Sequence, residues 1–123
     1  MIFLSDSSVR YAVDICREKE GYNIVIAATK ESRDIAVEKL LLLTMDADDV
    51  RIINSYNNFK IMFDNGSLIL LISAEDSSRG HRAHLLVVDE LASEEYVHTI
   101  LRPMETLAWS EYREKQKANE ETR

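Results

Sequence analysis

The chain of 123 residues has few residues that interrupt or crosslink a fold: one cysteine, one proline and three glycines. The lone Cys16 cannot form a disulfide within the chain, so the composition does not support secretion. Scarce glycine and proline argue against long linkers or disorder. No apolar run approaches the length of a membrane span, and Met1–Leu4 is too short and lacks the basic start of a signal peptide. We therefore expect one cytoplasmic globular domain spanning residues 1–123.

Positive charge is also scarce, since 15 Lys and Arg face 22 Asp and Glu, for a net charge of -7. A freestanding nucleic-acid binder usually presents a basic face. The charge balance therefore disfavours autonomous, charge-driven binding to DNA. It remains compatible with a protein that works beside DNA while another domain or subunit holds it, so we expect any DNA contact to be indirect.

The dipeptide Gly-Lys is absent, because Gly21, Gly66 and Gly80 are followed by Tyr, Ser and His. In the phosphate-binding loop G-x-x-x-x-G-K-[ST], also called Walker A, backbone N–H groups surround the phosphates and the lysine reaches the β- and γ-phosphates. Neither this loop nor a near match to it occurs in the chain.

The apolar pattern predicts alternating strands and helices. Strands are expected over residues 2–4, 22–28, 50–53, 59–63, 67–73 and 84–88. Helices are expected over residues 8–20, from Thr29 or Ser32 to about 43, from Ser93 to Pro103, and from 104 to about 118. The Asn65-Gly66 pair predicts a β-hairpin. The fold class is therefore α/β: a three-layer sandwich with a mostly parallel central sheet plus a β-hairpin, ending in a polar helix at about 104–123.

An Asp-Glu pair follows the last predicted strand, in the stretch Leu85–Glu90. Ligands bind at the carboxyl edge of open α/β sheets, where these two acids would emerge. Asp89 could hold a water of a Mg²⁺ ion, and Glu90 could activate the attacking water as a catalytic base. The alternative is structural, because acidic residues are common at the helix start that follows any apolar strand.

Four stretches around this pair resemble the ATPase domain of the large terminase subunit, the motor that packages DNA into tailed-phage heads. Their order and spacing agree with the family over about residues 22–104. They are the hairpin Phe63–Ile69 (FDNGSLI), the Arg79-Gly80 pair, the strand and turn Leu85–Ala92 (LLVVDELA), and the segment Ile100–Pro103 (ILRP).

The resemblance implies a truncated P-loop NTPase-like fold, Mg²⁺ and ATP as ligands, and DNA packaging as the process. It assigns Asp89 to the metal (Walker B) and Glu90 to water activation, and it makes Arg79 a candidate phosphate contact, although a solvated arginine is the simpler reading. The expected partners are other terminase or packaging subunits, or the rest of a split protein, and a homo-oligomer stays open. A phage-encoded chain would work in the host cytoplasm.

The segment Ser5–Ser8 (SDSS) occupies the place of the missing phosphate loop. It begins a predicted helix, whose N-terminus attracts anions, so Ser7 and Ser8 are the candidate phosphate contacts. It has no lysine, however, and Asp6 would repel phosphate. We therefore expect a terminase-like domain or fragment that is not a competent ATPase alone. The alternative is a standalone, catalytically inactive relative that acts as a protein-binding regulator or structural component.

Overall fold

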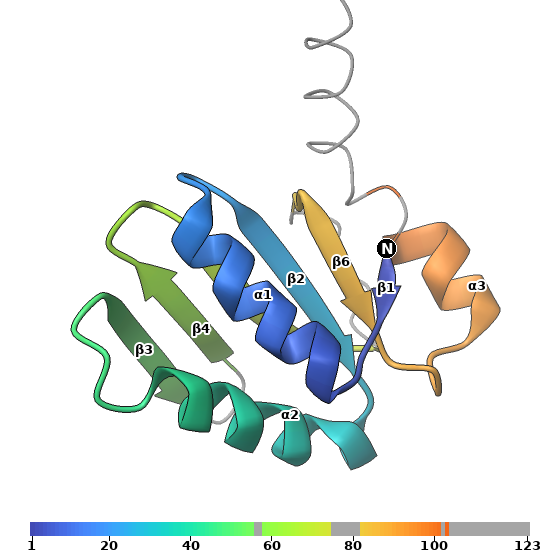
Figure 1. Cartoon of the computed structure of the whole chain (residues 1–123). Helices are drawn as coiled ribbons and strands as arrows, with labels where there is room; N and C mark the ends of the chain where they lie inside the picture. Colours follow the sequence, from blue (N-terminus) through green and yellow to red (C-terminus); the bar gives the residue numbers. More distant parts are fainter. Residues whose placement is uncertain (56–57, 75–81, 102, 104–123) are drawn as a thin grey trace, which may run out of the picture.

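The computed structural model describes residues 1–55, 58–74, 82–101 and 103. Arg79 and the predicted polar helix at about 104–123 lie outside this part. The described chain is α/β, as predicted: strands and helices alternate up to α2, and four consecutive strands follow before α3 (Figure 1). Its elements are β1 (Ile2–Phe3), α1 (Asp6–Glu18), β2 (Asn23–Ala28), α2 (Lys30–Thr44), β3 (Val50–Ser55), β4 (Asn58–Phe63), β5 (Leu68–Ser73), β6 (Leu85–Val88), α3 (Glu94–Tyr96) and the π-helical turn η1 (Val97–Leu101).

The strands form one six-stranded sheet in the order β1-β6-β2-β5-β4-β3. The pairs β1–β6, β6–β2 and β2–β5 are parallel, whereas β5–β4 and β4–β3 are antiparallel. The predicted parallel arrangement is thus confirmed for β1, β6, β2 and β5. The predicted hairpin of β4 and β5 is antiparallel, so the sheet as a whole is mixed. No helix in the described residues is long and apolar enough to cross a membrane.

Both faces of the sheet are covered by apolar side chains. Successive residues of a strand point to opposite faces, and accordingly Ile24 and Ile26 belong to a cluster with residues of α1 and α2. Val25 and Ala27 belong to a second cluster that includes Leu101 of η1. Two long helices therefore cover one face, and the α3–η1 segment packs on the other, which agrees with a coarse α/β sandwich.

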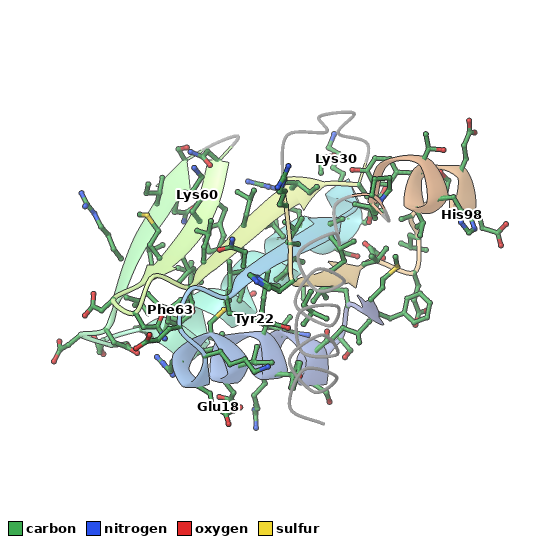
Figure 2. All side chains as sticks on the ribbon, turned by 90° about the horizontal axis from the view of Figure 1, so that it is seen from above. Glu18, Tyr22, Lys30, Lys60, Phe63 and His98 are labelled. Carbon is green, nitrogen blue, oxygen red and sulfur yellow. The ribbon has the colours of Figure 1, made fainter. Side chains whose placement is uncertain are left out.

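The two faces can be followed in Figure 2. Glu18 of α1 and His98 of η1 lie on opposite sides of the sheet. Lys60 and Phe63 of β4 also lie on opposite faces, and Phe63 is buried in the α1–α2 cluster. Half-buried and buried residues alternate along the whole of β4.

Helix α1 begins two residues earlier than predicted because Ser5 caps it. The Ser5 hydroxyl accepts a hydrogen bond from the Ser8 backbone N–H at 3.1 Å, and the Ser8 hydroxyl accepts one from the Ser5 N–H at 2.7 Å. This reciprocal pair is a capping box, here with serine in the second position. The SDSS segment is thus the N-cap and first turn of α1.

The turn between β4 and β5 closes the predicted hairpin in a different form. A two-residue Asn-Gly turn would need positive φ at both residues, but within this turn only Gly66 has it, at 87°. The Gly66 N–H bonds to the Phe63 carbonyl, and the Phe63 N–H bonds to the Ser67 carbonyl. The loop is therefore the longer kind, in which a glycine in the left-handed region ends the turn.

Strands β3 and β4 extend beyond their predicted bounds, by two residues at the end of β3 and by one at the start of β4. Strand β3 continues to Ser55 and β4 begins at Asn58, with these two residues paired in the antiparallel register. The Ser55 hydroxyl donates to the Asn58 carbonyl at 3.2 Å. Because β3 is an edge strand that is mostly exposed, polar residues can extend it without burial.

Candidate functional site

The carboxyl ends of β1, β6 and β2 meet at one edge of the sheet. Phe3 and Ala27 both pair with Val88, the last residue of β6, so Asp89, which follows it, lies between the other two strand ends. The chain leaves β1 and β2 toward α1 and α2, whereas it leaves β6 toward α3. Neighbouring strands whose connections go to opposite faces form a crevice at this edge, the usual place for a ligand in an open α/β sheet.

Asp89 is held in this crevice by the start of α2. One carboxylate oxygen, Oδ2, accepts hydrogen bonds from the Thr29 hydroxyl at 2.6 Å and the Thr29 N–H at 3.0 Å. The other, Oδ1, accepts one from the Leu91 N–H at 3.0 Å. Thr29 is the N-cap of α2, yet its side chain makes no cap hydrogen bond to the helix. The Thr29 hydroxyl therefore bonds to Asp89 and does not cap the first turn of α2.

The Asp89 carboxylate is ionised although its residue is only 6% exposed. Burial by itself would raise the pKa of Asp89, but hydrogen bonds from the Thr29 hydroxyl, the Leu91 N–H, the Ser32 hydroxyl and the Thr29 N–H outweigh burial and lower the pKa to about 2. The N-terminus of α2 adds a favourable dipole for a negative charge. A carboxylate so strongly ionised cannot act as a general acid near neutral pH.

Glu90 lies in a different environment from its neighbour. It is exposed and sits in the turn that follows β6, where the Ala92 N–H bonds back to the Asp89 carbonyl at 3.0 Å. The pair therefore divides into one buried acid that is bonded within the protein and one acid that faces solvent. Of the two, Glu90 is the one that a water or a partner can reach without rearrangement.

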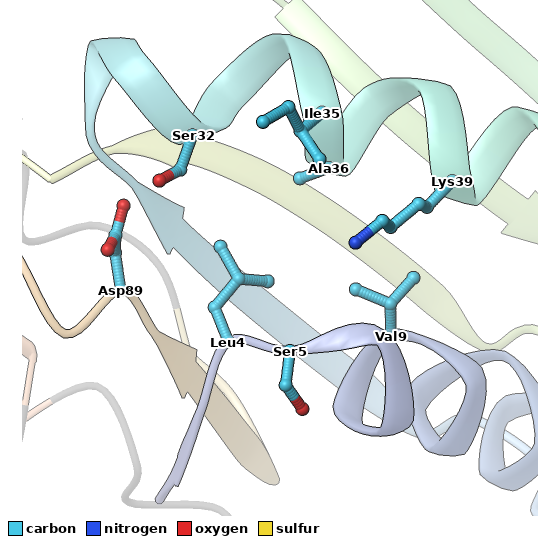
Figure 3. A pocket seen from close by; sticks show the side chains of 8 residues that line it. All are labelled: Leu4, Ser5, Val9, Ser32, Ile35, Ala36, Lys39 and Asp89. Carbon is cyan, nitrogen blue, oxygen red and sulfur yellow. The ribbon is translucent and has the colours of Figure 1, made fainter.

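A pocket of about 160 Å³ opens beside Asp89, between the starts of α1 and α2. Figure 3 shows the Asp89 carboxylate and the Ser32 hydroxyl at one end and the Lys39 amine at the other. Lys39 forms an ion pair with Asp6 in the first turn of α1. The pocket is lined by Leu4, Ser5, Val9, Ser32, Ile35, Ala36, Lys39 and Asp89. It is smaller than the roughly 300–1,000 Å³ of typical small-ligand sites.

The predicted phosphate contacts do not face this pocket. Ser7 is exposed on the first turn of α1. Ser8 is buried, and its hydroxyl both accepts from the Ser5 N–H and donates to the Ser5 carbonyl at 3.0 Å. Ser5 lines the pocket in their place. The S-x-x-S spacing could have identified Ser5 as the cap and Ser8 as its partner.

Sequence reasoning missed the site roles of Thr29, Ser32 and Lys39. Thr29 directly follows a buried parallel strand, so the rule that placed Asp89 at the sheet edge also applied to it. Ser32 comes one helical turn later, on the same side. Lys39 carries no local signal, because it reaches the pocket only through the packing of α2 beside α1.

The described side chains around Asp89 do not form a ready site for Mg²⁺ with ATP. Mg²⁺ is usually bound by one or two carboxylates together with substrate phosphates. Asp89 already accepts hydrogen bonds on both oxygens, and Lys39 is paired with Asp6. Within residues 1–55, 58–74 and 82–101, no group of three or more His, Cys, Asp or Glu side chains could hold a metal ion.

Comparison of the chain with protein-family models, with curated proteins and with solved structures found no significant match.

Proposed function

We propose that this chain is a terminase-like, P-loop NTPase-type domain that keeps the Walker B aspartate but does not hydrolyse ATP by itself. The main support for the proposal is the hydrogen bond from the Thr29 hydroxyl to the Asp89 carboxylate at the sheet edge. The neighbouring turn between β1 and α1 contains no phosphate-binding loop. Phosphoryl transfer depends on positioned cations and donors around the phosphates. In this chain the Asp89 carboxylate is instead hydrogen-bonded by donors of the protein itself.

In this proposal Asp89 has exchanged a metal-binding role for a structural one, and Glu90 remains at the edge as an accessible acid. The chain acts in the host cytoplasm as a non-hydrolysing member of a DNA-packaging assembly. Its net charge of -7 favours contact with other packaging subunits over direct contact with DNA. The standalone regulator is the version best supported, because the Asp89 site is complete without a second chain.

The first test is phosphate release and nucleotide binding by the purified full chain with Mg-ATP. We expect no release above that of Glu90→Gln, and no change in the fluorescence of a ribose-labelled ATP analogue. Hydrolysis that Glu90→Gln abolishes would overturn the proposal. Circular dichroism of both proteins checks that each is folded.

The second test separates a regulator from one half of a split enzyme. The full chain is added to the product of a neighbouring reading frame that carries a Gly-Lys-Ser/Thr loop, and phosphate release is measured. A regulator changes the rate equally as wild type and as Glu90→Gln. A split enzyme instead gives activity that requires both chains and disappears with Glu90→Gln.

A further inference from the structure

Helix α2 is apolar on its outer side as well as on the side that faces the sheet. On the side that faces the sheet, its residues Ala36, Leu40 and Thr44 are buried. On the outer side, Ile35, Leu42 and the C-cap residue Met45 are 55%, 61% and 61% exposed. The helix lies at the margin of the molecule in Figure 1. Large exposed apolar side chains that gather on one face, rather than singly, mark interaction sites.

The exposed residues follow the spacing of a helix-packing seam. Ile35, Glu38 and Leu42 are separated by three and four residues, which is the a-d-a spacing of a coiled-coil stripe. Met45 follows three residues later as the C-cap of α2, in extended backbone. Three of these four positions are apolar. A hollow of about 260 Å³ lies along the same stretch, lined by Asp34, Val37, Glu38, Leu41, Leu42 and Met45. An apolar stripe of this kind fits the apolar face of another helix.

Most of the exposed charges around this seam are acidic, with Lys30 at the start of α2 as an exception. Glu31, Asp34 and Glu38 lie on the exposed side of α2, and Asp46 and Asp48 are exposed just beyond its end. Because opposite charges across an interface select the partner and like charges exclude it, the seam matches an apolar stripe flanked by basic residues.

Lys39, which borders the same face of the helix, is already ion-paired with Asp6. A second copy of this chain would bring Glu31, Asp34 and Glu38 close to their own counterparts, and an anionic membrane would meet the same acids. Charge therefore argues against both of these occupants.

We propose that the outer seam of α2 (Ile35, Glu38, Leu42 and Met45) is a docking surface for an amphipathic helix of a partner protein, with Lys or Arg flanking its apolar stripe. The inference does not rest on the proposed function. Leu42 is ten residues from Ser32, about 15 Å along the helix, so its substitution leaves the Asp89 contacts in place.

The test uses two synthetic helical peptides with the same leucine stripe, one flanked by lysine and the other by glutamate. Each is titrated into the full chain and followed by calorimetry. We expect the lysine peptide to bind at least about tenfold more tightly than the glutamate peptide. We also expect its affinity to fall as salt is raised.

Variants of the chain assign the binding to the seam. Leu42→Gln is expected to weaken the lysine peptide about tenfold or more. Leu91→Gln is the matched control, since Leu91 is 67% exposed but lies outside the seam, in the β6–α3 connection. The charge reversal Glu38→Lys should reduce the preference for the lysine peptide and improve binding of the glutamate peptide.

Three results would overturn the proposal. The first is equal binding of the two peptides or no binding of either. The second is equal weakening by Leu42→Gln and Leu91→Gln. The third is self-association of the chain, or binding to phosphatidylserine vesicles, that Leu42→Gln removes, because the seam would then serve a second copy or a membrane. Circular dichroism of each variant checks that the fold is retained.

Discussion

The Thr29 hydroxyl lies 2.6 Å from Asp89 Oδ2, so a side chain at the start of α2 holds the end of β6. The same oxygen also accepts the Thr29 N–H. This contact joins two segments that are 60 residues apart in the sequence. It connects the ends of β2 and β6, where a ligand would enter. It also makes Asp89, the first acid of the Asp-Glu pair, part of the folded structure.

Thr29→Val tests whether this contact stabilises the fold. Valine has nearly the volume of threonine but no hydroxyl, so the buried carboxylate loses its shortest hydrogen bond. We expect the free energy of unfolding in urea to fall by about 1.5–3 kcal/mol, the usual value for a hydrogen bond to a charged group. Thr29→Ser keeps the hydroxyl and should lose clearly less. Equal losses in the two variants would show that packing, and not the hydrogen bond, is responsible.

The low pKa of Asp89 predicts a specific loss of stability in acid. Its pKa is about 2 in the folded chain and 3.8 for an unperturbed aspartate. The folded state therefore prefers the ionised form. The resulting stabilisation is present in full above about pH 5 and is lost as the pH falls from about 5 to 2. It amounts to roughly 1–2 kcal/mol, reduced by solvent at the sheet edge.

The measurement is the free energy of unfolding of wild type and Asp89→Asn between pH 2 and 7. Asparagine does not titrate, and its NH₂ group cannot accept the Leu91 N–H. The variant should be less stable at pH 7, and the difference from wild type should shrink as the pH falls. A difference that stays constant over this range would contradict an ionised Asp89 in the folded state. Comparing the two proteins removes the contribution of the other 21 acidic residues, since they are shared.

Strand and helix positions followed from local pattern, because alternation and helical spacing reflect which side chains are buried. The paired residues Asp89 and Glu90 could be placed at the sheet edge for the same reason. Their division into a buried and an exposed acid could not, because it depends on Thr29, which approaches Asp89 only after β2 and β6 pair. Ser8 was predicted to contact phosphate, but its hydroxyl is bonded to Ser5 within the capping box.

The DNGS turn shows a further limit of local pattern. The sequence predicted a hairpin there, and a hairpin forms, but the turn also closes the end of α1. The Asn65 amide donates to the carbonyls of Cys16 at 2.7 Å and Lys19 at 3.2 Å. The Ser67 hydroxyl donates to the Lys19 carbonyl at 2.5 Å and accepts the Tyr22 N–H at 3.0 Å. No pattern within either segment predicts that these two will meet.

Asn65→Ala should therefore destabilise a helix that is distant in sequence. It leaves carbonyls at the end of α1 without their partner and removes the acceptor for the Ser67 N–H. We expect a loss of about 1–3 kcal/mol in urea unfolding. Asp64→Ala is the matched control, because Asp64 is the exposed neighbour in the same turn, and its loss should stay within about 0.5 kcal/mol. Equal losses would mean that the turn acts only through its backbone.

Cys16 provides a chemical readout of the same region. Burial raises the pKa of the Cys16 thiol to about 12, and the residue has no exposed surface. At pH 8 only about one thiol in ten thousand would be ionised, and the thiolate is the form that reacts. Ellman's reagent should therefore label the native chain far more slowly than the chain unfolded in guanidinium. Asn65→Ala should accelerate labelling, because α1 opens more often when its C-terminus is uncapped, whereas Asp64→Ala should not. Prompt reaction of the native wild-type thiol would contradict the buried position of Cys16.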